Sequence, residues 1–296
     1  MSLVYYLIII PLSWLPSWLL YGLSDFLLYP IIYKIAGYRK KVVINNIKKV
    51  FPDHSDQQIL QITQQFYHHF CDMMVESIML FGMSKEQAIK RCKLVNPEIF
   101  QKYYEQGRSV ALVGGHYNNW EILAVAIAPQ IIHQVDAIYA PLSNVFMDKK
   151  MKASRSKYGL RMVPKKESAE FMEQTIAEKT CMIFAIDQSP SRNQKAYWIN
   201  FLGQETAVAF GTERYATKYD WPVLFCHLRK VKRGHYEMEI ELVTEQPNQV
   251  ETGWITQKHS QIIEQDILAQ PQYWLWTHKR WKRKRKNDEI INDSLL

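Results

Sequence analysis

Short, wholly apolar runs alternate with amphipathic stretches through the middle of the chain, and this alternation predicts the fold. Residues 110–113 (V-A-L-V) and 181–186 (C-M-I-F-A-I) are continuous apolar runs of strand length, typical of strands buried on both faces. Further strands are expected at 93–95, 135–140, 221–228 and 236–243, and helices at 144–157, 168–178, 207–219 and 254–269. The alternation predicts an α/β fold with a mainly parallel sheet flanked by helices, and the half-polar 236–243 run suits a sheet edge.

The first 33 residues follow another pattern, with one charged residue, Asp25, and three prolines. The uncharged run up to Ser24 is long enough to span about 30 Å of hydrocarbon as a helix. The prolines favour a kinked, half-immersed anchor over a straight span, and a buried helical hairpin of a soluble core is the alternative. The basic cluster at 34–41 places the remainder in the cytoplasm by the positive-inside tendency. We therefore expect a membrane anchor at 1–36 and one catalytic domain at 37–296.

Two amphipathic helices are expected between this anchor and the sheet. The first covers residues 39–51 and is ended by Pro52. Ser55 and Gln58 have the spacing of a capping box, which opens a second helix that reaches about Leu80.

The stretch that follows the strand at 110–113 carries the candidate chemistry. It reads G-G-H-Y-N-N-W-E, so a tight turn at Gly114 and Gly115 leads to a helix capped by Asn118 or Asn119. His116 and Glu121 are five residues apart, which on one helix means a rotation of roughly 140°. They can meet only if His116 lies in the turn, where a carboxylate on one ring nitrogen would leave the other free as a general base.

A second polar pair follows the other apolar run. Asp187 and Gln188 come directly after residues 181–186, and the carboxyl ends of parallel strands meet at the same edge of a sheet. If the two strands are neighbours, His116 and Asp187 reach the same rim. There Asp187 and Gln188 could bind substrate hydroxyls, or they could form a plain strand-end turn.

The His116/Glu121 spacing alone is a weak signal. Nine His and 29 acidic residues in 296 predict about one H-x4-[D/E] by chance. The second occurrence, His259/Glu264, lies within one expected amphipathic helix, where the spacing separates the side chains. We interpret that pair as the chance occurrence.

The distribution of charge indicates what kind of partner the chain binds. The net charge of +8 includes seven basic residues between Lys279 and Lys286, interleaved with tryptophans at 274, 276 and 281. With an apolar N-terminus in the same chain, an anionic membrane or a phosphorylated lipid fits this patch better than nucleic acid.

Four scattered cysteines without C-x-x-C predict no metal site and no disulfide framework. Since G-x-S-x-G is absent, no covalent acyl-enzyme is indicated.

Five ordered blocks resemble one enzyme family. G-G-H-Y-N-N-W-E resembles the H-x4-D/E block of membrane acyltransferases, and more narrowly that of the lipid A late acyltransferases, which often reads H-x-G-N-W-E; Asn118 stands where that family often has Gly. The other blocks are the basic segment that ends in Phe-Pro at 51–52, Asp187-Gln188, F-L-G at 201–203, and P-Q-Y-W-L-W-T-H-K-R-W-K at 271–282. F-P-E-G-T-R, typical of glycerol-phosphate acyltransferases, is absent.

This resemblance implies transfer of a fatty acyl group from acyl-acyl carrier protein, or acyl-CoA, to a hydroxyl of a lipid A precursor. It implies no cofactor, and a location at the cytoplasmic face of a bacterial inner membrane. His116 would be the base and Glu121 its orienting carboxylate. Substrate contacts are expected from Asn119, Arg155, Asp187, Gln188 and Arg280, with Arg155 on a phosphate and Arg280 on a headgroup. The alternatives are another acceptor (an aminolipid, glycolipid or lysophospholipid) and a non-catalytic lipid-binding homologue.

Overall fold

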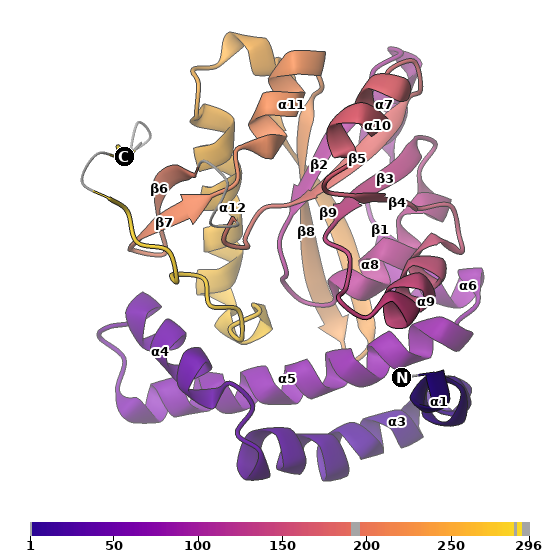
Figure 1. Ribbon diagram of the computed structural model, residues 1–296, viewed down its shortest axis with the longest axis vertical. Helices are drawn as coiled ribbons and strands as arrows, with labels where there is room; N and C mark the ends of the chain where they lie inside the picture. The colour runs from indigo at the N-terminus through magenta and orange to yellow at the C-terminus, as the bar shows by residue number, and fades with distance from the viewer. Residues whose placement is uncertain (1, 191–195, 287–288, 292–296) are drawn as a thin grey trace.

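A seven-stranded sheet with helices on both faces organises the chain, in a computed structural model that describes residues 2–190, 196–286 and 289–291 (Figure 1). The strands are β1 (Cys92–Leu94), β2 (Val110–Gly114), β3 (Gln134–Tyr139), β4 (Arg161–Pro164), β5 (Thr180–Ala185), β8 (Val223–Lys232) and β9 (His235–Thr244). Their order is β1-β9-β8-β2-β5-β3-β4, and every neighbouring pair except β8/β9 is parallel. The predicted α/β fold with a mainly parallel sheet is confirmed.

Strand β2 lies at the centre and is buried on both faces, as its apolar run predicted. Residues 110–113 are each at most 1% exposed. Ala111 and Val113 pack into one core, together with residues of α11 (Gly211–Tyr219) and α12 (Trp254–Ala269). Val110 and Leu112 pack into the other, together with residues of α7 (Glu98–Glu105) and α8 (Trp120–Ala126). Because successive side chains of a strand point to opposite faces, β2 contributes to two separate hydrophobic cores.

A long helix, α5 (Asp56–Gly82), lies between the sheet and the N-terminal helices (Figure 1). It opens with the predicted capping box, since the Ser55 hydroxyl accepts the Gln58 N–H and the Gln58 side chain accepts the Ser55 N–H. The remaining helices of the domain are α4 (Lys40–Val50), α6 (Lys85–Arg91), α9 (Val145–Ser156) and α10 (Ser168–Gln174). Helix α5 lies across one end of the sheet (Figure 1), where its Glu76 contacts β9 and the residue that caps α8.

Two expectations about secondary structure were wrong. Strand β9 is not the sheet edge, because the three-residue β1 pairs with its first residues, Tyr236 to Met238. The expected 207–219 helix starts only at Gly211, because residues 207 and 208 belong to a hairpin of β6 (Tyr197–Phe201) and β7 (Gln204–Val208). Leu202 and Gly203 form its two-residue turn with φ of 54° and 68°, the left-handed backbone that such turns require.

The N-terminal segment, residues 2–36, consists of short helices and π-helical turns that pack along α5. These are α1 (Ser2–Val4), Tyr5–Ile9, α2 (Ile10–Ser13), α3 (Ser17–Leu23), Ser24–Leu28 and Pro30–Ile35. Leu20 is fully buried in the core that also holds Val75 and Leu80, and the Ser24 hydroxyl donates to Asp72 at 2.8 Å. The segment is therefore fastened to the rest of the chain by both apolar and polar contacts.

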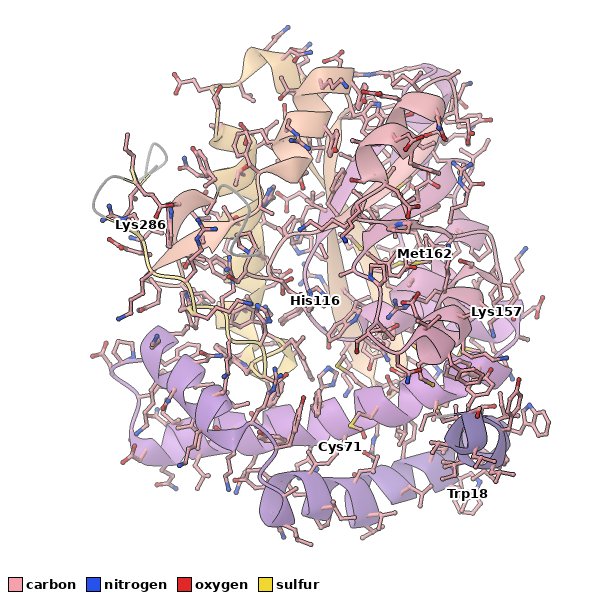
Figure 2. The ribbon with its side chains drawn as sticks, in the orientation of Figure 1. Trp18, Cys71, His116, Lys157, Met162 and Lys286 are labelled. Carbon is pink, nitrogen blue, oxygen red and sulfur yellow. The ribbon has the colours of Figure 1, made fainter. Side chains whose placement is uncertain are left out.

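The outward side of the N-terminal segment is strongly apolar. Its exposed large side chains are Leu3, Val4, Tyr6, Leu7, Ile8, Trp14, Leu15, Trp18, Leu19, Phe26, Leu27, Ile31 and Ile35. Figure 2 shows Trp18 on the outer side of the molecule, away from the sheet. Among the described residues, no single helix has both the length and the apolar character to cross a membrane. Ser17–Ile35 and Lys40–Val50 meet that test only as a pair, bent by 81°.

Candidate active site

The turn between β2 and α8 has a backbone that few residues tolerate. A Cβ on Gly115 would lie 1.9 Å from Ile263 Cδ1 and 3.2 Å from Asp187 Cγ, so glycine is what allows this close approach. Asn118 has φ of 52°, a left-handed conformation that Gly and Asn adopt most readily. Its side chain also donates to the Leu228 carbonyl at 2.6 Å. The structure thus explains why Asn replaces the Gly that the resembling block often has here.

His116 and Asp187 meet at the ends of neighbouring strands, which confirms their predicted position on one rim. Strands β2 and β5 are parallel, with Gly114 opposite Ala185. His116 Nδ1 lies 2.7 Å from Asp187 Oδ1, and the His116 backbone N–H donates to Oδ2 at 2.8 Å. The indole N–H of Trp274 donates to the same Oδ2 at 2.8 Å. Asp187 therefore holds both the ring and the backbone of His116.

Asp187 and His116 each stabilise the charged form of the other, which shifts both pKa values. Burial alone would raise the pKa of Asp187, but the charge of His116 and the hydrogen bonds from His116 and Trp274 lower it to about 2. Burial alone would lower the pKa of His116, but the charge of Asp187 and the hydrogen bond to it outweigh that effect, so its pKa is raised. Asp187 is thus an anion that can only accept, which assigns the Nδ1 proton to His116 and leaves the lone pair on Nε2.

The second ring nitrogen of His116 faces the solvent side of the rim. The imidazole is 19% exposed, and Figure 2 shows it between the sheet and α5. The exposed Gln188 places its side-chain nitrogen 3.0 Å from His116 Nε2. Trp120 packs its ring against His116 edge-on, with centroids 4.9 Å apart. The polar neighbour of Nε2 is therefore a neutral amide, that of the exposed Gln188.

The structure pairs Glu121 differently from the expectation. Glu121 lies in the first turn of α8, where it accepts from Arg155 Nε at 2.8 Å and Arg155 Nη2 at 2.6 Å. It does not hydrogen-bond His116, whose pKa its charge still raises. The expected carboxylate partner of the imidazole is thus replaced by Asp187, and the guanidinium expected on a phosphate is occupied by a bidentate ion pair between α8 and α9.

Asn119 also differs from the expectation, since it does not face a substrate. It is fully buried, and its side-chain oxygen accepts the backbone N–H groups of Glu121 and Ile122, both at 3.1 Å. Its side-chain nitrogen donates to Glu76 at 2.5 Å. Asn119 is the N-cap of α8, so these two N–H groups at the helix start are already satisfied.

Arg280 lies inside the molecule rather than at a headgroup. It is 2% exposed and donates to the Ala207 carbonyl at 2.8 Å, and burial lowers its pKa to about 10. Trp274 and Trp276, expected at a membrane interface, are 2% and 0% exposed. The basic composition of the tail hid the fact that its aromatic residues belong to the core.

The C-terminal strap, residues 271–281, completes the site, and sequence reasoning missed its role. Besides Trp274, its Leu275 N–H donates to the His116 carbonyl at 3.1 Å. His278 Nε2 accepts the Ser189 N–H at 3.1 Å, and burial lowers the pKa of His278 to about 4, so it is neutral. Only the resemblance of this block to a family signature marked it; its spacing does not show which side chain reaches Asp187.

Two further features of the sequence were the absence of a metal-site motif and the second H-x4-E occurrence, His259/Glu264. Among the described residues, no group of three or more His, Cys, Asp and Glu side chains is arranged to hold a metal ion. His259 and Glu264 lie on α12, as expected; His259 is 1% exposed, and burial lowers its pKa to about 3. His259 is therefore a neutral core residue.

Comparison with known proteins shows the family of the chain. The sequence model of the family described as bacterial lipid A biosynthesis acyltransferase matches residues 3–283. The chain is 20% identical over 251 residues to a protein of Haemophilus influenzae named lipid A biosynthesis acyltransferase, covering 84% of this chain and 79% of that protein. The similarity therefore includes the β2–α8 turn, Asp187 and the C-terminal strap.

Proposed function

Because the chain belongs to the bacterial lipid A biosynthesis acyltransferase family and is an acyltransferase, we propose that it transfers a fatty acyl group from a thioester to a hydroxyl of a lipid A precursor, with His116 as the base. One observation carries the assignment of the base. His116 Nδ1 lies on an ionised carboxylate while Nε2 faces the neutral amide of the exposed Gln188. This arrangement prepares one nitrogen to take a proton.

The proposed step moves one proton and exchanges one bond. His116 Nε2 accepts the proton of the acceptor hydroxyl as its oxygen attacks the thioester carbonyl carbon. The tetrahedral intermediate collapses, the carbon–sulfur bond breaks, and the imidazolium returns the proton to the leaving thiolate. Asp187, held at 2.7 Å from Nδ1, fixes the tautomer and stabilises the imidazolium. Direct transfer needs no covalent acyl-enzyme.

Gln188 occupies the place that the acceptor hydroxyl must take. Its amide nitrogen lies 3.0 Å from Nε2, the distance at which a hydroxyl would donate its proton. Gln188 is exposed and neutral, so a hydroxyl can displace it without separating an ion pair. We propose that it moves aside when the acceptor binds and then contacts another of its polar groups.

The acyl donor and the location follow from the family resemblance and the surface. We propose an acyl-acyl carrier protein or acyl-CoA donor, no cofactor, and a site at the cytoplasmic face of a bacterial inner membrane. The support for membrane association is the apolar outer side of the N-terminal segment, where Trp14 and Trp18 are 75% and 69% exposed. Tryptophans at such positions are typical of membrane interfaces.

The first experiment measures acyl transfer from a labelled acyl carrier thioester to a panel of lipids that includes a lipid A precursor. We expect transfer to that precursor by the purified protein, loss of transfer in His116→Ala, and wild-type activity in the exposed control His54→Ala. Transfer only to an aminolipid, glycolipid or lysophospholipid would keep the chemistry and replace the acceptor. No transfer to any lipid by the folded protein would favour a lipid-binding role. Full activity of His116→Ala would overturn the assignment of His116 as the base.

Membrane association has a separate test. Trp14→Ser with Trp18→Ser is expected to weaken co-sedimentation with vesicles that contain anionic phospholipid, since each change removes an exposed indole. Ile176→Ser, which alters a 50% exposed apolar residue outside the N-terminal segment, is the matched control. Equal binding by all three proteins would contradict the proposed membrane face.

A further inference from the structure

A buried carboxylate outside the site is the focus of an unusual set of hydrogen bonds. Glu76, on α5, is 2% exposed. Its Oε1 accepts the Tyr21 hydroxyl at 2.9 Å, and its Oε2 accepts the Tyr236 hydroxyl at 2.8 Å and the Asn119 side-chain nitrogen at 2.5 Å. The three donors come from the N-terminal segment, from β9 and from the residue that caps α8. No step of the proposed reaction uses Glu76.

The bond to Asn119 fixes which way its amide faces. Asn119 uses its oxygen on two N–H groups of α8 and its nitrogen on Glu76. Turning the amide over would set its N–H groups against the donors of the helix and its oxygen against a carboxylate. Both contacts would be repulsive, so an acceptor at position 76 specifies the capping orientation.

The first turn of α8 places two groups around the base. Trp120 opens the helix and packs edge-on against His116, and Glu121 follows with its ion pair to Arg155. Because α8 has only seven residues, its start depends strongly on its cap. A shift of the cap would therefore be transmitted directly to the surroundings of His116.

We propose that Glu76 is a positioning residue for the acyl transfer: through Asn119 it sets the start of α8 and with it the placement of Trp120 and Glu121 beside His116. This inference rests on the proposed function. Tyr21, in the N-terminal segment, donates to the same carboxylate. Glu76 therefore links the N-terminal segment, whose outer side is apolar, to Asn119, the cap of α8 beside the site.

The choice of a carboxylate supports a positioning role over simple packing. Burial raises the pKa of Glu76, and hydrogen bonds from Tyr236, Asn119 and Tyr21 oppose that rise. An apolar side chain of similar volume would fill the same space without the desolvation of a charge. What it could not do is accept three hydrogen bonds, one of them from the cap.

The test removes the acceptor and then exchanges donor and acceptor. Glu76→Met leaves the three donors unpaired, and we expect kcat to fall about 10- to 100-fold, because small displacements near reacting groups have effects of this size, while KM changes little. Asn119→Asp alone sets two carboxylates against each other and should lower kcat similarly. Adding Glu76→Gln to Asn119→Asp restores one donor facing one acceptor, and this double variant should recover most of the lost kcat.

A matched control separates positioning from stability. Asp72 is also a buried carboxylate of α5, but it pairs with Ser24 and Arg233 and does not reach α8. Asp72→Leu should therefore lower the melting temperature as Glu76→Met does while keeping kcat near wild type. Equal kcat losses in these two variants, or no recovery in the double variant, would overturn the inference.

A substrate-free measurement keeps this test independent of the acyl acceptor. Hydrogen exchange at the amides of Glu121 and Ile122, followed by mass spectrometry, should be faster in Glu76→Met, and in the double variant it should return toward the wild-type rate. Asp72→Leu should leave it unchanged. Unaltered exchange in Glu76→Met would overturn the inference, whereas failure of the wild-type protein to transfer acyl groups would contradict only the proposed function.

Discussion

Two histidines, His116 just past the end of β2 and His227 within β8, each place Nδ1 on an aspartate, and they differ in what faces Nε2. His116 Nδ1 lies 2.7 Å from Asp187 and His227 Nδ1 lies 2.8 Å from Asp266. His116 Nε2 faces the neutral amide of Gln188, whereas His227 Nε2 lies 3.0 Å from the carboxylate of Glu241. An imidazole between two carboxylates donates through both nitrogens and has no lone pair to offer. Of the two histidine–aspartate pairs, only that of His116 therefore keeps a lone pair for the proposed proton transfer, because its second nitrogen faces no anion.

The largest difference is expected when each histidine is removed. His116→Ala loses the proposed general base, so kcat should fall about 10²- to 10⁴-fold. His227→Ala should keep kcat within a few-fold but lower the free energy of unfolding by about 1–3 kcal/mol, because it leaves partly buried acceptors unpaired. Steady-state kinetics and thermal unfolding of both variants check this. Comparable kcat losses in the two would remove the functional distinction.

The second-largest effect is expected when Asp187, the partner of His116, is changed. Asp187→Asn can present an N–H to Nδ1 and so shift the proton of His116 to Nε2, where the lone pair is needed. We expect kcat to fall roughly 10²- to 10³-fold, because the lone pair of Nε2 is then occupied by a proton. Asp266→Asn is the matched change beside His227 and should leave kcat near wild type. Kinetics at several pH values separate loss of the tautomer from a simple pKa change.

A smaller effect is expected when the surroundings of the two Nε2 atoms are interchanged. Gln188→Glu gives His116 a second carboxylate, which should raise its pKa further and lower kcat about tenfold at a pH below the new pKa. Glu241→Gln should instead lower the pKa of His227 without affecting acyl transfer. The imidazole resonances of labelled protein, titrated by NMR, report both pKa values. A Gln188→Glu protein with unchanged rate and pKa would show that residue 188 does not face the base.

The smallest effect, one of pH alone, has opposite consequences at the two histidines. Both pKa values are raised above the usual 6.5: burial lowers each, and the adjacent carboxylates outweigh it. Transfer requires neutral His116, so kcat/KM should fall as pH drops through a value above 6.5. Charged His227 stabilises the fold, and its contribution is complete below pH 6.5 and lost as pH rises through its folded pKa. His227→Ala should reduce that alkaline loss of stability, to which His116 also contributes, and keep the acid limb of kcat/KM.

The sequence was sufficient to predict the elements that carry the base. The apolar runs at 110–113 and 181–186 predicted two buried strands, and their parallel pairing brings His116 and Asp187 to one rim. The two glycines predicted the turn. These features follow from local chemistry, because burial on both faces requires a continuous apolar run and a tight turn requires residues without a Cβ or tolerant of left-handed backbone.

What the sequence did not reveal is which carboxylate faces the imidazole. Proximity in the chain favoured Glu121, five residues from His116, over Asp187, 71 residues away. The choice depends on side-chain directions at the turn, which the left-handed Asn118 and the cap at Asn119 determine. The burial of Arg280 was equally hidden, because a run of basic residues looks exposed until the hairpin that covers it is known.

The C-terminal strap has a consequence for the way the protein is made. During synthesis the histidine leaves the ribosome first, its aspartate follows, and the indole that anchors this aspartate emerges last, at Trp274. Until then the carboxylate lacks one of its three donors, and the His116 carbonyl lacks the N–H of Leu275. A nascent chain can therefore assemble the sheet before its reactive pair is complete. The proposed transfer therefore depends on contacts from residues that are synthesised late.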